Sequence, residues 1–237
     1  MPKNFDWEEF LPKPINQSQC GSCYLISTLQ MIEARLLIHY NEPIKLSTAF
    51  INDCNYYSQG CNGGYSMEVM RFIFENYALP LHCKQSYNKR CVQYCSENEF
   101  ETLKVVKLKS YGYVGGFYNA VSEEDIKFEI FKNGPVVMSL QSPLDLGFYL
   151  KGVYKPIGST SVQDFGNFLK PEWVEVNHSV LVYGWGEKDG VKFWRAQNSW
   201  GEEWGEKGRF KILRGQNVLG LESMVESGMP YIIDLGD

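Results

Sequence analysis

Apolar residues in the first half of the chain recur at helical spacing. From Leu25 to Leu36 they follow one another at steps of three and four residues, which predicts a helix over 23–40 with one buried face. The same spacing over 67–77 predicts a second helix. A third helix is predicted over 122–134, because Ser122 is a favourable N-cap and a Gly-Pro pair follows the last apolar residue.

The period changes to two in the second half of the chain. Strands are predicted over 136–140, 179–183, 191–198 and 210–214, with an Asp-Gly turn before the third. Helices followed by strands indicate an α+β chain. We expect one domain over residues 1–237, made of a helical lobe of roughly 17–110 and an antiparallel, β-barrel-like lobe of roughly 111–237, with a cleft between the lobes.

Charge and hydropathy exclude several classes of protein. The chain has 237 residues and a formal net charge of -5, and no basic run stands out, which argues against nucleic acid as a partner. No apolar stretch reaches the ~18 residues of a membrane span, so we expect no membrane partner. The first residues lack the apolar segment of a signal peptide.

All seven cysteines fall before residue 96. An odd number favours three disulfides and one free thiol, and therefore an oxidising compartment. A zinc site is the alternative, because Cys20 and Cys23, and also Cys91 and Cys95, have the spacing of zinc ligands. No pair of histidines follows them, so we expect no metal.

The segment from Gln17 to Tyr24 holds the strongest candidate for chemistry. It places Cys23 behind a Cys-Gly-Ser turn, at the first position of the predicted helix. The unpaired N–H groups and the positive dipole end of a helix favour a thiolate there. The thiolate is the nucleophilic form of cysteine, so Cys23 is the candidate nucleophile.

A thiol nucleophile needs a base, and the chain has three histidines. His39, near a helix end, and His82, in a cysteine-rich segment, have structural interpretations, whereas His178 begins a predicted strand from which it could reach across the cleft. Asn198 is the candidate that orients the imidazole, with Trp200 covering the bond between them. Gln17 could offer its side-chain amide to an oxyanion, beside the Cys23 N–H.

These segments together resemble the papain family of cysteine peptidases over essentially the whole chain. Within that family the resemblance is greatest to the cathepsin C-like dipeptidyl aminopeptidases, on the segments 23–24, 31–35, 57–64, 113–118 and 221–223. The resemblance implies a two-lobe papain-like fold. It implies the roles of nucleophile for Cys23, base for His178, orienting group for Asn198 and oxyanion donor for Gln17.

Further residues are assigned only by this resemblance. Gly63 and Gly64 would pair with an extended peptide substrate, and Tyr65, Met67 and Met224 would line the pocket for the second substrate residue. The subfamily binds a chloride ion near that pocket, and Tyr113 matches the tyrosine that offers it a hydroxyl. The disulfides implied by the resemblance are Cys20–Cys61, Cys54–Cys91 and Cys83–Cys95.

The resemblance leaves the specificity open between an aminodipeptidase and an open-cleft endopeptidase. We expect neither the inhibitory propeptide nor the exclusion domain of the subfamily within this chain, so either could be a separate partner besides peptide or protein substrates. The sequence leaves the oligomeric state undecided, and the resemblance implies a lysosomal or secreted location. The long loop 158–176 matches a segment that the subfamily cuts during maturation. Less favoured alternatives are a non-catalytic peptide-binding homologue and an acyltransferase with the same Cys-His pair.

Overall fold

The computed structural model describes residues 1–80, 104–156 and 175–234. Its helices are α1 (Cys23–Tyr40), α2 (Thr48–Cys54), α3 (Ser66–Glu75) and α5 (Glu123–Asn133), with short 3-10 turns η1 (Glu8–Phe10), η2 (Gly60–Asn62), η3 (Leu144–Phe148) and η4 (Val218–Gly220). Its strands are β1 (Phe5–Asp6), β2 (Lys104–Tyr113), β3 (Val136–Leu140), β4 (Val153–Tyr154), β5 (His178–Lys188), β6 (Val191–Gln197), β7 (Arg209–Leu213) and β8 (Val225–Asp234).

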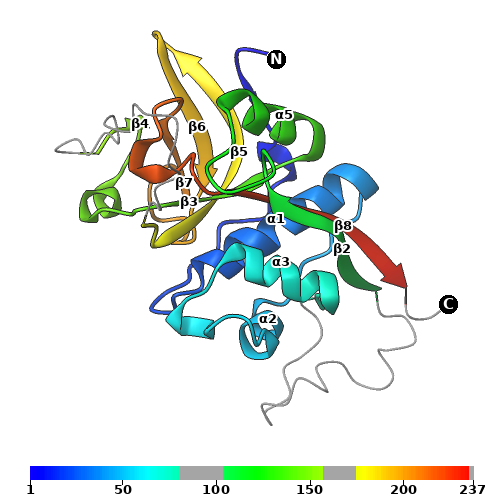
Figure 1. Ribbon diagram of the computed structural model, residues 1–237. Helices are drawn as coiled ribbons and strands as arrows, with labels where there is room; N and C mark the ends of the chain where they lie inside the picture. The colour runs from blue at the N-terminus through cyan, green and yellow to red at the C-terminus, as the bar shows by residue number, and fades with distance from the viewer. Residues whose placement is uncertain (81–103, 157–174, 235–237) are drawn as a thin grey trace.

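The strands form one sheet in the order β2-β8-β3-β5-β6-β7-β4, with β1 added beside β5. Every pairing is antiparallel except that of β4 with β7, which is parallel. The expected α+β class and two-lobe papain-like fold are therefore confirmed, with one parallel pair in a sheet expected to be antiparallel throughout. Figure 1 shows β5 and β6 above α1, α2 and α3, β2 and β8 beside α1 and α3, and α5 in the upper part of the molecule.

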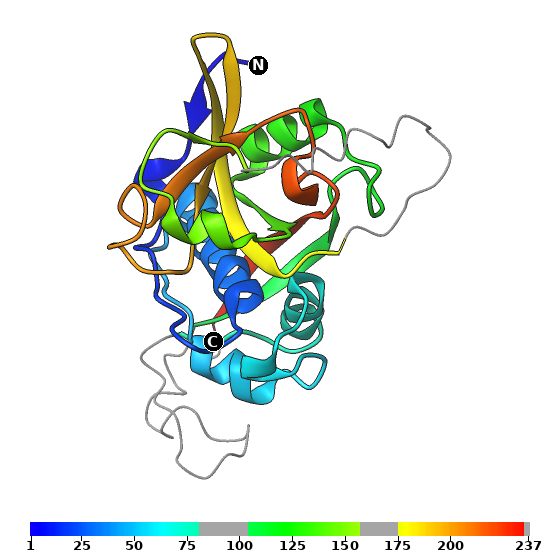
Figure 2. The same cartoon turned by 90° about the vertical axis from the view of Figure 1, so that its left-hand side faces the viewer.

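Two hydrophobic cores flank α1. One core joins the buried faces of α1, α2 and α3 to β2, and the other joins α5 to β3, β5, β6 and β7. Val137 and Leu181 carry the first core into the sheet. In both views α1 runs between α2 and α3 on one side and the strands β5, β6 and β7 on the other (Figures 1 and 2), so the residue at its start lies where the two lobes meet.

The lobes exchange their ends. The C-terminal strand β8 pairs with β2 and β3 of the sheet, and its Ile232 and Ile233 pack against the helical core. In the other direction, the N-terminal strand β1 pairs with β5, and Phe5 and Trp7 pack against the core of the sheet. Each lobe is thus closed by a segment that reaches it from the other side.

The three predicted helices are confirmed, and Ser122 caps α5 by accepting a hydrogen bond from the Asp125 N–H. The strands predicted at 136–140, 191–198 and 210–214 are confirmed within one residue, and β5 continues beyond the predicted 179–183. The elements α2, β2 and β8 were not predicted. The loop 158–176 lies almost wholly outside the described residues.

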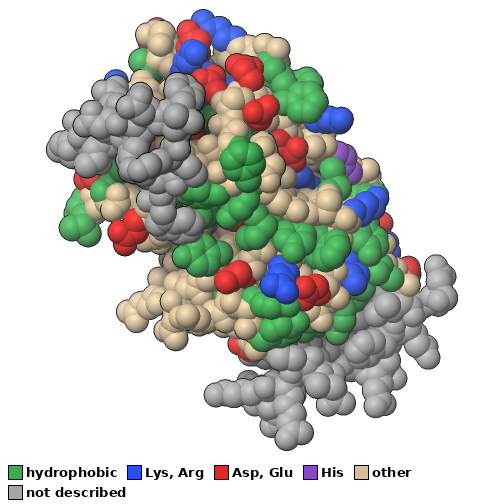
Figure 3. Space-filling model, viewed as in Figure 1, with side chains coloured by type: hydrophobic (Ala, Val, Ile, Leu, Met, Phe, Trp, Pro, Cys, Tyr) green, Lys and Arg blue, Asp and Glu red, His purple; other side chains and the backbone are tan. Residues whose placement is uncertain are grey.

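The face toward the viewer in Figure 3 carries a band of hydrophobic side chains over α3 and β2. Phe74 of α3, with 43 % of its surface exposed, contacts the ring of Tyr111 on β2 with 5.4 Å between the ring centroids.

Across residues 1–80, 104–156 and 175–234, no helix is both long and apolar enough to cross a bilayer.

Candidate active site

The turn before α1 is held in place from both sides. A disulfide joins Cys20 to Cys61, and the Gly21 N–H donates to the Cys61 carbonyl at 2.8 Å. A Cβ on Gly21 would lie 2.8 Å from that carbonyl oxygen, closer than real contacts allow, so only glycine fits the turn. The chain therefore enters the helix with Cys23 at its first position.

Cys23 is a free thiol with 9 % of its surface exposed. Burial raises the pKa of this thiol, and the backbone N–H groups of Ser179 and Tyr24 beside the sulfur lower it only in part. The helix start, which favours a thiolate, and the burial, which favours the thiol, act on this group in opposite directions. One of these backbone groups, that of Ser179, belongs to β5 of the opposite lobe.

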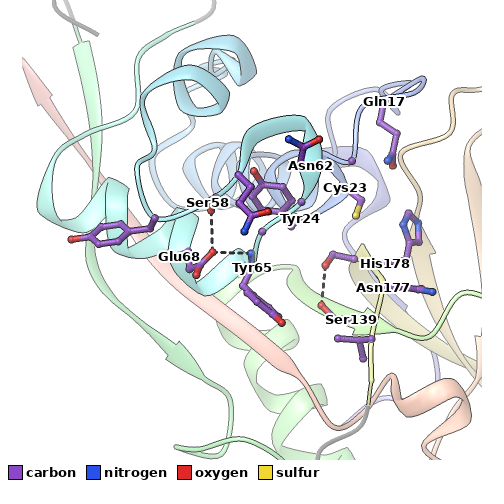
Figure 4. Close-up of a pocket in the computed structure, with 17 residues that line it drawn as sticks. Gln17, Cys23, Tyr24, Ser58, Asn62, Tyr65, Glu68, Ser139, Asn177 and His178 are labelled. Carbon is purple, nitrogen blue, oxygen red and sulfur yellow. Dashed lines mark hydrogen bonds between the residues drawn. The ribbon is translucent and has the colours of Figure 1, made fainter. Parts of the chain in front are cut away.

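His178 is the first residue of β5 and is 6 % exposed. Burial lowers the pKa of its imidazole, and the hydrogen bond to Asn198 raises it in part. Figure 4 shows the His178 ring and the Cys23 sulfur facing each other across the cleft. Burial thus raises the pKa of the thiol and lowers that of the imidazole, acting in both against the charged form.

A hydrogen-bond chain fixes which ring nitrogen of His178 carries the proton. The Ser199 N–H donates to Asn198 Oδ1 at 2.8 Å, so this atom of the amide is the oxygen. His178 Nε2 lies 2.7 Å from the same oxygen and is therefore the donor. Nδ1 of the neutral ring is left as the acceptor, available to the Cys23 proton. Trp200 stacks on the ring with 4.9 Å between centroids.

We expect Asn198→Ala to lower kcat on the order of 10²-fold, with a smaller effect on KM, because the ring would lose the acceptor that fixes its tautomer and orientation. Steady-state kinetics on a peptide amide measures the split between kcat and KM. Asn133→Ala is the matched control, because that amide bonds Glu129 on α5. Equal kinetic effects of the two variants would remove the orienting role from Asn198.

Gln17 is clamped beside the nucleophile. Its Nε2 donates to the Cys20 carbonyl at 2.9 Å, and its Oε1 accepts from the Ser199 hydroxyl at 2.5 Å. A side-chain amide has two N–H groups, so one remains for an oxyanion. Figure 4 shows the Gln17 side chain pointing toward Cys23 and the His178 ring.

A cleft of about 460 Å³ connects these residues to the predicted substrate-binding glycines. Its lining includes Gln17, Cys23 and His178 and, further along, Gly63, Gly64 and Tyr65. A Cβ on Gly64 would lie 2.7 Å from both the Ser58 side chain and the Tyr24 ring, so glycine alone leaves this wall flat. An extended peptide could approach the backbone of 63–65.

The two predicted pocket methionines do not line this cleft. Met67 follows Ser66 in the first turn of α3 and is half-buried, and Met224 is 1 % exposed. The Met224 carbonyl accepts from the Ser139 N–H at 3.1 Å, and Ser139 itself lines the cleft. Met224 therefore lies beside Ser139 of the wall with its own side chain buried.

Sequence analysis missed an acidic residue in the cleft. Glu68 lines it, and its Oε2 accepts from the Tyr65 N–H at 3.2 Å and from the Ser58 hydroxyl at 3.1 Å. The signal was present, because Glu68 stands at the third position of α3, where a carboxylate accepts from the residue before the helix. That pattern predicts a helix cap, but it does not predict that the carboxylate lines a cleft.

The remaining predicted residues divide between the described and the undescribed parts of the chain. The Cys20–Cys61 bridge is confirmed, and it removes Cys20 from the zinc alternative. The other two bridges involve residues outside the described ranges, as does His82. His39 Nε2 lies 2.9 Å from the Asn133 carbonyl, which joins α1 to α5 away from the cleft. The described ranges contain no group of three or more His, Cys, Asp or Glu side chains arranged to hold a metal ion.

The family is established by comparison with known proteins. The model of the papain family of cysteine proteases matches residues 1–229, so the chain belongs to this family. Cathepsin C of Schistosoma mansoni is 35 % identical over 236 residues, covering 94 % of this chain and 50 % of the relative. Cysteine proteinase 2 of Zea mays is 31 % identical over 209 residues, covering 86 % and 53 %. The chain thus spans about half the length of the curated relatives it matches.

Solved structures share the fold. A digestive procathepsin L 3 of Tenebrio molitor superposes with a TM-score of 0.77 at 22 % identity, covering 96 % of this chain and 69 % of that one. The proform of the ragweed cysteine protease Amb a 11 gives a TM-score of 0.76 at 26 % identity, covering 99 % and 66 %. Both relatives were solved as proforms.

Proposed function

We propose that this chain is the peptidase domain of a thiol-dependent hydrolase that removes dipeptides from the N-termini of peptides and proteins when the protein is complete. One observation carries the catalytic part of the proposal. The bond from His178 Nε2 to Asn198 leaves Nδ1 as a base on the side of the buried Cys23 thiol, in a cleft that reaches a flat glycine wall.

Acylation begins with transfer of the Cys23 proton to His178 Nδ1. The sulfur attacks the scissile carbonyl carbon, and its oxygen becomes an oxyanion that the free N–H of the Gln17 amide and the Cys23 N–H stabilise. The imidazolium then gives its proton to the leaving amine as the C–N bond breaks. A thioester between Cys23 and the substrate remains.

Deacylation repeats these steps with water as the nucleophile. His178 Nδ1 accepts a proton from the water as its oxygen attacks the thioester carbon, and the sulfur leaves. The stacked Trp200 shields the ring's bond to Asn198 from solvent. An amine in place of water would give acyl transfer instead, so the acyltransferase alternative differs only in the acceptor.

The preference for a free N-terminus is supported by the family resemblance and by Glu68. Its carboxylate lies beside Tyr65 at the cleft wall, where lone pairs remain beyond its two hydrogen bonds. An ammonium group at the start of a substrate would be attracted to it. An open-cleft endopeptidase is the alternative, because cleavage within a chain needs only the glycine wall and the nucleophile.

The test is hydrolysis of one fluorogenic dipeptide amide with its N-terminus free and with it blocked, in the presence of thiol. We expect the free substrate to be preferred, and Glu68→Gln to lower kcat/KM for it by about 5- to 10-fold while leaving the blocked substrate unchanged. Glu75→Gln, at the other end of α3, is the matched control. Equal cleavage of both substrates would favour the endopeptidase, and no cleavage of either would favour a non-catalytic peptide-binding protein.

We propose a lysosomal or secreted location, supported by the Cys20–Cys61 disulfide, which belongs to an oxidising compartment. We also propose that a propeptide or exclusion domain acts on this cleft as a further partner. The support for that partner is that the matched segments cover only 50 % and 53 % of two relatives and that two solved neighbours are proforms.

A further inference from the structure

Of the carboxyl side chains in the part of the chain the structure describes, only Glu226 is fully buried, at 1 % exposed. It lies on β8, where it pairs with Tyr113 of β2 on one side and with Val137 of β3 on the other. No Lys or Arg within the described residues forms a salt bridge with it. A buried carboxyl without a cation is costly, so its surroundings call for an explanation.

The Glu226 carboxyl points at the first turn of α3. Neither of its oxygens has a hydrogen-bond partner of good geometry within the described residues, yet the Ser66 side chain and the Met67 N–H lie close enough to lower its pKa. Burial outweighs them and raises the pKa to about 7. The N-terminal turn of a helix offers free N–H groups and the positive end of its dipole, which is the environment of an anion.

Tyr113 completes this environment from the neighbouring strand. Residues paired directly across two antiparallel strands place their side chains on the same face of the sheet, so Tyr113 and Glu226 project toward α3 together. Burial raises the pKa of the Tyr113 hydroxyl, and the charge of Glu226 raises it further. The tyrosine that the family resemblance assigns to a chloride ion therefore faces a carboxyl group of its own chain.

A chloride ion does not fit beside that carboxyl. Two neighbouring negative charges repel each other, and Glu68, in the same helical turn, adds a third. Where Glu226 is protonated, its side chain still fills the space. We propose that the Glu226 side chain occupies, from within the chain, the position at which the resemblance places chloride, so that this protein binds no halide there.

The position matters because α3 follows directly from the cleft wall. Gly63, Gly64 and Tyr65 precede the first residue of α3, and Ser66 at that position contacts Glu226. Glu226 is thus a positioning residue for the substrate-binding wall, acting through the start of α3. Hydrolysis by this protein is then independent of chloride, which the subfamily resemblance alone would not suggest.

The test compares the melting temperature in sodium chloride and in sodium gluconate at equal ionic strength, at one acidic and one alkaline pH. The wild-type chain is expected to melt at the same temperature in both salts. Glu226→Ala empties the position, so its melting temperature is expected to rise with chloride or bromide and to saturate, as ligand binding requires. Glu226→Gln fills the space without the charge and serves as the control that stays unresponsive.

Adding Tyr113→Phe to Glu226→Ala identifies the site, because the halide response should weaken when the hydroxyl donor is removed. Saturable stabilisation of the wild-type chain by chloride would overturn the proposal, and so would a folded Glu226→Ala variant that ignores halides. The wild-type measurement decides the question if that variant does not fold. Melting needs no substrate, so this result stands apart from the proposed peptidase activity.

Discussion

Cys23→Ala is expected to abolish peptide hydrolysis and to leave the fold intact. The variant removes the only atom that can form the acyl intermediate, so kcat/KM should fall on the order of 10⁴-fold or more. The backbone of the turn is held by the disulfide and by hydrogen bonds that do not involve the Cys23 side chain. The loss of one buried sulfur should therefore change the melting temperature by only a few degrees.

Thiol-reactive epoxides give the second measurement for Cys23. Mass spectrometry of the treated protein should find the label on Cys23 in the wild-type chain and no label at that position in the variant. Thr28→Val, a buried replacement one turn further along α1, is the matched control and should retain activity. Hydrolysis by Cys23→Ala at the wild-type rate would remove the thiol mechanism altogether.

Arg35→Met is expected to lower the free energy of unfolding by about 3–5 kcal/mol. Arg35 is 1 % exposed and its guanidinium joins three parts of the fold. Nη2 pairs with Glu129 of α5 at 2.9 Å, Nε donates to the Pro135 carbonyl at 2.9 Å, and Nη1 donates to the Gly228 carbonyl of β8 at 3.3 Å. Methionine fills similar volume but leaves these acceptors without their donor.

Urea denaturation followed by circular dichroism measures the change. Arg71→Met is the matched control, because Arg71 pairs with Glu75 on the surface of α3 and is 52 % exposed in its side chain. An exposed pair of this kind contributes about 0–1 kcal/mol. If the two variants lost equal stability, the buried guanidinium would not be the tie between α1 and the sheet.

The sequence was sufficient for elements whose pattern is complete within one segment. The helix α1 buries a continuous apolar face, and α5 carries both its cap and its terminating glycine. The helix α2 was missed because its seven residues are too few to show a period. The strand β8 was missed because Gly228 and Pro230 interrupt it, and pairing with β2 and β3 holds it extended despite them.

The candidate site divides in the same way. The roles of Cys23, His178 and Asn198 could be predicted from the sequence alone, because the residues next to each of them form recognisable motifs. The surroundings of the Cys23 sulfur could not be foreseen in full, because Ser179, whose backbone lies beside it, belongs to the other lobe. The role of Glu226 could not be predicted from the sequence for the same reason. The groups around its carboxyl belong to α3 and to Tyr113, which are distant in sequence.

The disulfide between Cys20 and Cys61 limits the redox conditions under which the active site can work. Cys23 is active only in its reduced state. Cys20, three residues before it, ties the turn to Cys61 only as a disulfide, across a separation of 41 residues. Disulfides are opened by thiolates, and the burial that raises the pKa of Cys23 acts against that form. Excess reductant would break the Cys20–Cys61 disulfide and loosen the turn, whereas excess oxidant would oxidise the Cys23 sulfur. Both conditions would lower the activity, by different chemistry.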